Sequence, residues 1–301
     1  MSGSIGSHIV REDDGAATGV WGPFVLKSAF QPIFAFEAGK LSVTAFEGLL
    51  RPFREGEFWT PLEFFNSIPA AERFPVETLS RTLHLTNAAA CLPQDASIFI
   101  NFDPSVFTAH ALVDAAINDM RLVLSETGIG PDRVVCEVTE KETTSQAALF
   151  ALVASLRESG FRIAVDDYGA DDSDMGRVRE LHPDIIKFDA KWIRRLMDTG
   201  PGYALLTTMV STFAEQGILT VFEGIEEPWQ LELAEKSGAA MVQGFVLARP
   251  ELAPTSFFEI SEPAPREHHR QHAPGLGGPT VPRAAGKSGQ SKSFGRRSQP
   301  Q

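Results

Sequence analysis

Polar side chains stand at or near the ends of most of the apolar, β-branched runs in this sequence. Five are carboxylates, two are carboxamides and one is an amine: Glu47, Asn101, Glu137, Asp166, Asp167, Lys187, Glu223 and Gln243. The carboxyl ends of the strands of a parallel barrel meet on one face, where the active sites of such barrels lie. If the runs are strands of one barrel, we expect these side chains to share one cleft.

Crowded carboxylates need a counter-charge. Glu47, Glu137, Asp166, Asp167 and Glu223 would repel one another and raise one another's pKa unless cations neutralised them. Oxygen ligands without cysteine or clustered histidine select hard ions over zinc. The sequence therefore predicts a site for Mg²⁺ or Mn²⁺.

Each of these residues, taken alone, also has a simpler explanation. A single glutamate at a strand end is usually a solvated rim residue, and the adjacent Asp166 and Asp167 could form a turn or cap a helix. Lys187 could pair with Asp184 or Asp189. The combination favours a site, because chance polarity at the rim has no reason to select the same end of six strands.

The elements that must position these residues alternate along the chain. Eight strands are expected near residues 25–36, 41–50, 97–102, 133–138, 161–166, 184–188, 219–222 and 240–245. Helical patterns fall between most of them, for example over residues 76–91, 142–159, 203–216 and 228–237. This alternation is typical of a parallel sheet, and eight is the strand number of a TIM-like (β/α)8 barrel.

The first two strands break this pattern. Only residues 37–40 separate them, which is too short for a parallel crossover, so they must form an antiparallel hairpin. We therefore expect an α/β fold, a (β/α)8 barrel with an antiparallel first strand.

The composition divides the chain into three parts. We expect a flexible N-terminal segment over residues 1–22, one folded domain over 23–258, and a disordered basic tail rich in Pro, Gly and Ser over 259–301. With 43% hydrophobic and 22% charged residues, the 301-residue chain can bury a substantial core. We see no internal repeat.

Charge and cysteine content limit the partners and the location. The formal charge of −12 argues against a general binder of DNA or of anionic membranes. Cys91 and Cys136 lie in apolar runs, which suits buried thiols in a reducing compartment. No apolar run is long enough to span a membrane, and the N-terminus lacks the order of a signal peptide. We expect a cytoplasmic protein.

Eight short motifs, in order, resemble those of the EAL family of cyclic di-GMP phosphodiesterases. They are FQPIF at 30–34, FEGLLRP at 46–52, INFDP at 100–104, EVTE at 137–140, VDDYGA at 165–170, IIKFD at 185–189, FEGIEE at 222–227 and QGFVLARP at 243–250. The resemblance covers about residues 25–251. It implies a barrel with an antiparallel first strand, in agreement with the hairpin, and hydrolysis of cyclic di-GMP to linear pGpG.

The resemblance also implies a role for each matched residue. Glu47, Asn101, Glu137 and Asp166 would hold one divalent ion, Mg²⁺ or Mn²⁺, and Asp166 would bridge to a second ion bound by Asp167 and Glu223. Glu47, Asp167, Lys187 and Glu223 would be catalytic, with Lys187 orienting the water or offsetting phosphate charge. Substrate contacts would come from Gln31, Arg51 and Gln243. Glu140 and Glu226 would hold the loop after Asp167.

Two departures from the family pattern leave an alternative open. Gly48 replaces the usual alanine, and Asp171, Asp172, Ser173 and Asp174 replace a Gly, aromatic, Ser sequence in a loop that the family uses near its dimer interface. The alternative is a catalytically weak or inactive cyclic di-GMP receptor that acts through a protein partner. A barrel enzyme for another phosphate ester or a sugar has no motif of its own here. The family also implies a homodimer, with regulation supplied by a partner.

Overall fold

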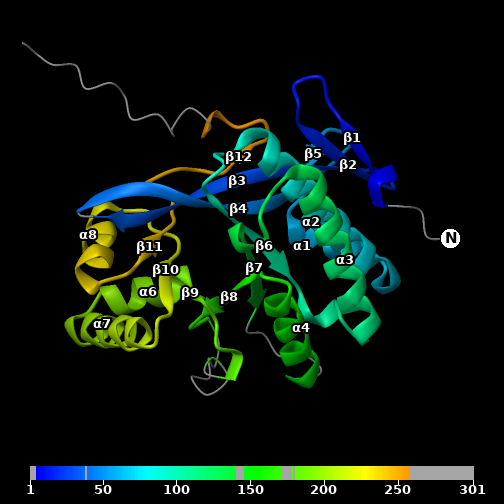
Figure 1. Cartoon of the computed structure of the whole chain (residues 1–301). Coiled ribbons are helices and arrows are strands. Elements are labelled where there is room, and N and C mark those ends of the chain that lie inside the picture. The colour runs from blue at the N-terminus through cyan, green and yellow to red at the C-terminus, as the bar shows by residue number, and fades with distance from the viewer. Residues whose placement is uncertain (1–4, 38, 140–145, 171–177, 179, 258–301) are drawn as a thin grey trace, which may run out of the picture. The chain divides into compact units, whose positions relative to one another are not determined.

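Eight strands close into a barrel in the computed structural model (Figure 1). The structure describes residues 5–37, 39–139, 146–170, 178 and 180–257. The barrel strands are β3 (Phe24–Glu37), β4 (Lys40–Arg54), β6 (Ser97–Phe102), β7 (Val134–Thr139), β8 (Arg162–Tyr168), β9 (Ile185–Phe188), β10 (Leu219–Phe222) and β11 (Met241–Val242). The predicted α/β barrel is confirmed.

The direction of the strands also follows the prediction. β3 pairs antiparallel with β4 and with β11, which closes the barrel, whereas the other six pairings are parallel. The two longest strands, β3 and β4, pair along their whole length and are the long blue ribbons that cross the upper half of Figure 1. The first strand of the barrel is therefore the antiparallel one.

A ring of apolar side chains fills the barrel interior. Each of the eight strands contributes one residue to a single buried cluster: Ile33, Ala45, Phe99, Val135, Ala164, Ile185, Val221 and Met241. These side chains are at most 7% exposed. The ring closes the barrel beneath the ends of the strands, so the barrel is a packed core and not a pore.

Helices cover the outside of the barrel, and their apolar faces form the largest core cluster. They are α1 (Pro61–Ser67), α2 (Ala70–Cys91), α3 (His110–Thr127), α4 (Gln146–Glu158), α6 (Ala190–Met197), α7 (Gly200–Glu215) and α8 (Pro228–Ser237). Short 3₁₀ helices occupy Ile5–His8, Pro104–Val106 and Pro131–Arg133. The predicted bounds hold for α8, whereas α2 begins before its predicted start and includes Pro75.

Two strands lie within residues 1–22, the segment that its composition predicts to be flexible. β1 (Ile9–Arg11) and β2 (Ala17–Trp21) form an antiparallel hairpin that extends the sheet beside β3. Asn87 of α2 fixes β2, because its side chain accepts from Ala17 N at 2.7 Å and donates to Ala17 O at 2.9 Å. A contact with a residue so distant in sequence is invisible to local composition.

The remaining strands are short: β5 (Glu57–Phe58) pairs with β4, and β12 (Glu251–Leu252) pairs with β3.

By its internal contacts the chain divides into Met1–Glu262 and Pro263–Gln301, and every described residue belongs to the first unit. The predicted tail over residues 259–301 and the sequence Asp171–Asp174 lie outside the described residues.

Candidate metal centre

A layer of polar residues lies next to the apolar ring, toward the carboxyl ends of the parallel strands. Its members are Gln31, Glu47, Asn101, Glu137, Asp166, Lys187, Glu223 and Gln243, one for each strand; Glu223 and Gln243 directly follow the last residues of β10 and β11. Each stands two positions from the ring residue of its strand, so the alternation of a β-strand places it on the same face. In β3 the polar residue precedes the ring residue, because this strand runs in the opposite direction. Strand period and barrel closure thus bring the predicted residues together.

Lys187 lies at the centre of this layer and contacts four carboxylates. Its Nζ is 2.5 Å from Glu137 Oε1 and 2.6 Å from Glu223 Oε1. It is also 3.3 Å from Asp166 Oδ1 and 3.6 Å from Glu47 Oε2. The Lys187 side chain is 1% exposed, and Glu137 is fully buried. One ammonium group is thus the counter-charge of four acidic side chains.

The simpler pairing of Lys187 with Asp184 or Asp189 is wrong. Asp184 Oδ2 accepts from Ile163 N at 2.8 Å, which joins the ends of two neighbouring strands. Asp189 caps α6 and accepts from Trp192 N at 2.8 Å. Both aspartates accept hydrogen bonds from backbone N–H groups, and Lys187 instead contacts the carboxylates of the barrel interior.

Burial and crowding shift the acidities of this cluster. Burial raises the pKa of Glu223 to about 8, although the Lys187 ammonium acts in the opposite direction. Burial also raises the pKa of Glu137 well above its usual value, again against the effect of Lys187. Burial alone would lower the pKa of Lys187, but the surrounding carboxylates outweigh it and raise that pKa. One ammonium therefore does not satisfy four carboxylates, and the site favours additional positive charge.

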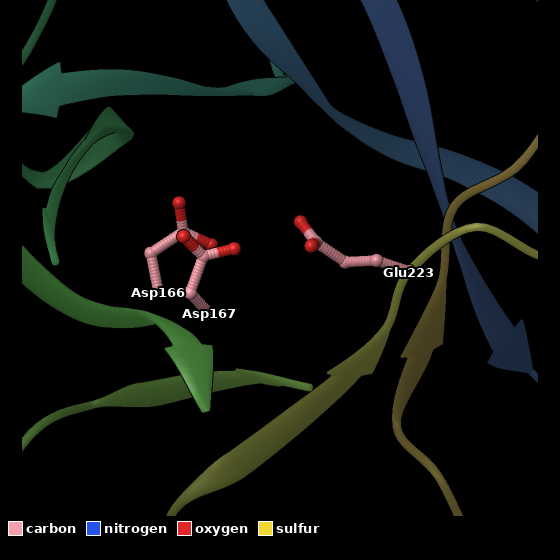
Figure 2. A group of neighbouring side chains, drawn as sticks. All are labelled: Asp166, Asp167 and Glu223. Carbon is pink, nitrogen blue, oxygen red and sulfur yellow. The ribbon is translucent and has the colours of Figure 1, made fainter. Parts of the chain in front are cut away.

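Three carboxylates of this region face one another across the end of the barrel (Figure 2). Asp166, Asp167 and Glu223 each offer an oxygen, and these oxygens lie within 4.8 Å of one another. Asp167 has a left-handed φ of 57°, and its carbonyl accepts from Ala170 N at 3.0 Å, so it also forms a turn, as the simpler explanation held. The turn places the Asp167 carboxylate beside that of Asp166.

The donor chemistry fits a hard divalent ion. All three of these ligands are carboxylate oxygens, which suit Mg²⁺, Mn²⁺ or Ca²⁺. Within the described part of the chain, the buried Oε2 of Glu137 has no hydrogen-bond partner. A buried carboxylate oxygen without a partner is costly, and a cation in this layer would satisfy it.

A cavity of about 350 Å³ opens above the layer. Its lining includes Gln31, Glu47, Asp166, Asp167, Lys187, Glu223, Glu226 and Gln243. Gln243 Nε2 donates to Glu47 Oε2 at 2.8 Å, and Gln31 Nε2 donates to Ala248 O at 3.2 Å. The two amides therefore lie on β3 and directly after the neighbouring strand β11, and each is held by a hydrogen bond.

Of the other predicted residues that the structure describes, Glu226 lines the cavity, whereas Arg51 and Asn101 do not. Half-buried Arg51 donates to Leu50 O at 3.1 Å; burial lowers its pKa, and the charge of Glu47 acts in the opposite direction. Asn101 is exposed and stands opposite Glu137 in the register of β6 and β7. Glu226 Oε1 is 3.4 Å from Arg194 Nη2, which links the loop after β10 to α6. Glu140 lies outside the described residues.

Sequence reasoning missed several residues that line the cavity. Phe245 is 49% exposed, and the Arg249 guanidinium carbon lies 4.4 Å from its ring centroid. Ala190, Gly224 and Gly244 provide the remaining wall. The only local signal for Phe245 is an aromatic residue two positions after Gln243, and the small residues carry no local signal.

The chain belongs to the EAL domain family, whose model matches residues 25–250. This confirms the resemblance found in the motifs. A relative in Bacillus subtilis, the uncharacterised EAL-domain containing protein YkuI, is 27% identical over 226 residues, which cover 73% of this chain and 54% of that protein. The cyclic di-GMP phosphodiesterase RocR of Pseudomonas aeruginosa is 27% identical over 175 residues, which cover 58% of this chain and 44% of that protein.

Solved structures show the same barrel. The BlrP1 protein of Klebsiella pneumoniae in complex with calcium and cyclic di-GMP matches with a TM-score of 0.66 and 28% identity, over 77% of this chain and 56% of that one. Its manganese and cyclic di-GMP complex matches with a TM-score of 0.66 and 27% identity, over 77% and 57% of the two chains. This chain spans about half the length of BlrP1 and of YkuI.

Proposed function

We propose that this protein is a divalent-metal-dependent phosphodiesterase that hydrolyses cyclic di-GMP to linear pGpG. The observation that carries the proposal is the polar layer, in which every barrel strand contributes one oxygen or nitrogen side chain above one apolar ring. Relatives named as cyclic di-GMP phosphodiesterases, such as RocR, and the metal complexes of BlrP1 with cyclic di-GMP support it.

Two ions, Mg²⁺ or Mn²⁺, would be held by the carboxylates and Asn101. Glu47, Asn101, Glu137 and Asp166 are assigned to one ion, and Asp166, Asp167 and Glu223 to the other. When bound, such ions lower the pKa of a water and stabilise charge on the phosphoryl oxygens. The close approach of Asp166, Asp167 and Glu223 supports the second group.

Lys187 stabilises the acidic cluster and acts on the reacting groups. Its ammonium contacts both Glu137 and Glu223, so it keeps the two carboxylates in place at the end of the barrel. Because it also lines the cavity, it can donate to the water or to a phosphate oxygen of the substrate. We assign Glu47, Asp167, Lys187 and Glu223 as the catalytic residues.

The nucleotide is held by the groups at the rim. The amides of Gln31 and Gln243 line the cavity and suit the polar edge of a guanine. Arg51 suits a phosphate or a guanine, because its guanidinium presents a planar set of donors. Glu226, through Arg194, fixes the loop after β10 relative to α6, and Glu140 is assigned a similar role in the loop after Asp167.

Substitution Glu47→Ala tests this proposal. It removes an assigned ligand that lines the cavity, so hydrolysis of cyclic di-GMP in Mn²⁺ should fall to background while the circular dichroism spectrum is unchanged. Glu57→Ala on β5 is the matched control, because Glu57 is exposed and outside the site; it should retain full activity. A Glu47→Ala protein that keeps most of its activity would refute the assignment.

A second candidate function is a cyclic di-GMP receptor with little or no catalysis. It is favoured by Asp171, Asp172 and Asp174, which add acidic residues to the sequence following Asp167. Binding of cyclic di-GMP in Mg²⁺ without product over hours would support the receptor, and rapid turnover would exclude it.

The expected assembly and location belong to this proposal. A homodimer and a regulatory protein partner are inferred from the family, and light scattering of the purified chain tests the first. Both cysteines, Cys91 and Cys136, are buried free thiols, which supports a cytoplasmic location. In the described residues no helix combines the length and the apolar character needed to cross a membrane.

A further inference from the structure

A buried polar network lies on the outer side of the β3–β4 hairpin, behind the residues that line the site. His84 of α2 is 3% exposed. Its Nδ1 is 2.8 Å from Ser28 Oγ on β3, and its Nε2 is 3.2 Å from Ser80 Oγ one helical turn earlier. Asn87 Nδ2 donates to the same Ser28 Oγ at 3.0 Å. The network therefore joins α2 to the strand that carries Gln31.

Every group in this network is satisfied with a neutral imidazole. Ser28 Oγ accepts from Asn87, and a neutral imidazole donates with one ring nitrogen and accepts with the other in its hydrogen bonds to Ser28 and Ser80. Burial, with a smaller contribution from the charge of Arg51, lowers the pKa of His84 to about 3. The ring is thus uncharged at neutral pH, and its position is fixed by one hydrogen bond on each nitrogen.

The imidazole lies directly against Gly48 of β4. A Cβ added to Gly48 would be 3.0 Å from His84 Cγ, 3.2 Å from its Cβ and 3.3 Å from its Cδ2. Gly48 does not have a positive φ, so its backbone conformation does not require glycine. The constraint is one of space: with an alanine at residue 48, the imidazole or the strand would have to move by a few tenths of an ångström.

His84 has little freedom to move away. Its two hydrogen bonds hold both nitrogens, and the ring of Phe30, which pairs with Gly48 in the sheet, lies edge-on at a centroid distance of 6.3 Å. A methyl group at residue 48 would therefore have to push β4 rather than the ring. Glu47 precedes Gly48 and points to the opposite face, into the site, so a shift of β4 moves its carboxylate.

We propose that His84 is a positioning residue for the site: with Gly48 it forms a matched pair that fixes the β3–β4 hairpin and so the carboxylate of Glu47. The inference rests on the proposed function in one respect, since it takes Glu47 as a metal ligand. The contact with His84 also explains why this chain has a glycine at residue 48, where the family usually has an alanine.

A double-mutant cycle tests the pair. We would measure thermal unfolding, and Mn²⁺ binding by calorimetry, for the wild type, Gly48→Ala, His84→Ala and the double variant. Gly48→Ala should lower the melting temperature by about 2 to 10 °C and weaken Mn²⁺ binding by about tenfold or more. When it is added to His84→Ala, the same substitution should cost much less, because the ring atoms are gone and only the Cβ of residue 84, at 3.2 Å, remains close to the new methyl group. The double variant should also bind Mn²⁺ more tightly than Gly48→Ala alone.

Two further variants keep the test decisive. His84→Phe retains a ring against Gly48 without its nitrogens, so Gly48→Ala should remain costly when combined with it, even if the His84→Ala protein is poorly folded. Gly19→Ala on β2 is the matched control: its Cβ would meet leucine side chains at 3.3 to 3.6 Å, and its effect should be the same with and without His84→Ala.

The outcomes separate this inference from the proposed function. A Gly48→Ala protein with wild-type stability and Mn²⁺ affinity would overturn the inference alone, as would equal effects of Gly48→Ala with and without His84→Ala. A wild-type protein that binds no Mn²⁺ would overturn the metal site and the positioning role together.

Discussion

The ammonium of Lys187 lies 2.5 Å from Glu137 Oε1, and neither side chain is more than 1% exposed. A buried carboxylate and a buried ammonium stabilise a fold only as a pair, because either one alone retains its desolvation cost. The Lys187 ammonium is also the counter-charge of Glu47, Asp166 and Glu223. It is therefore both a structural counter-charge and the cation nearest to the assigned metal ligands.

Replacing Lys187 by methionine should destabilise the protein strongly when no metal is present. The substitution leaves buried carboxylates without a counter-charge, which costs about 3 to 5 kcal/mol in the free energy of unfolding. Mn²⁺ should restore part of this loss, since it supplies positive charge to the same oxygens. Urea unfolding with chelator and with Mn²⁺ measures both effects.

Lys236→Met is the matched control for that experiment. Lys236 Nζ is 2.5 Å from Glu232 Oε1, but both side chains are at least 60% exposed. Such an exposed pair contributes little to stability, because solvent screens the two charges. Equal losses for the two variants would contradict the counter-charge role of Lys187.

The stability of the metal-free protein should fall as the pH rises from about 6.5 to 8. The pKa of Glu223 is about 8 in the folded protein and 4.5 ordinarily, so in this range the folded state binds more protons than the unfolded state. The folded state is therefore destabilised relative to the unfolded state as the pH rises and Glu223 loses its proton. One such proton lowers the free energy of unfolding by about 1.4 kcal/mol per pH unit. Buried His84, with its pKa lowered from 6.5 to about 3, acts in the opposite direction below about pH 7, so it reduces the slope at the lower edge of this window.

The control for this pH dependence is Glu223→Gln, which carries no titrating proton at that residue. The free energy of unfolding of this variant should depend less steeply on pH than that of the wild type. The pH dependence that remains comes from Glu137, whose pKa is raised well above its usual value, and from Glu77, whose pKa is raised to about 7. Unfolding in urea with chelator across this range provides the comparison. An unchanged slope would show that Glu223 is ionised in the folded protein.

Substitution Asp167→Asn should abolish hydrolysis without unfolding the protein. Asparagine tolerates the left-handed φ of 57° found at Asp167, so the turn is retained while one anionic oxygen is lost. We expect a fall in turnover of at least about 100-fold with a melting temperature close to that of the wild type. Turnover near the wild-type level would remove Asp167 from the assigned ligands.

Gly169→Ala should destabilise the end of β8 more than a comparable glycine substitution elsewhere. Gly169 has a φ of 93°, and an added Cβ would lie 2.6 Å from Cγ of Trp192. Trp192 is stacked on Phe188 at a centroid distance of 5.6 Å, which limits its retreat. Gly15 has a similar φ of 87°, but an added Cβ would have no atom within 4 Å. Gly15→Ala therefore measures the cost of the backbone conformation without a steric clash.

We expect Gly169→Ala to cost about 1 to 3 kcal/mol more than Gly15→Ala in the free energy of unfolding. Because Gly169 follows Asp167 closely, the hydrolytic rate should fall as well, whereas Gly15→Ala should retain it. If the two variants lose equal stability, the Trp192 contact does not constrain this turn.

Much of the barrel and of the site could be predicted because both depend on local periodicity. The apolar runs indicated the strands of the barrel, and the short span between residues 37 and 40 required the antiparallel hairpin. Glu47 and Glu223 could be placed together because barrel topology brings strand ends to one face. Motif order then indicated the family.

The remaining features depend on contacts between distant segments. β2 is held by Asn87, and its five residues, ATGVW, lie in a polar, glycine-containing part of the sequence that does not by itself predict a strand beside the barrel. The partners of Lys187 come from four other strands, so spacing favoured nearby aspartates instead. The packing of His84 against Gly48 is likewise visible only in three dimensions.

The most direct test of the proposed activity is chromatography of the products after the purified chain is incubated with cyclic di-GMP and Mg²⁺ or Mn²⁺, with and without chelator. The account predicts linear pGpG in the presence of either ion and none with excess chelator. Unchanged cyclic di-GMP after prolonged incubation with folded, metal-supplied protein would contradict it, and a parallel binding measurement would then distinguish a receptor from a barrel that does not recognise this nucleotide.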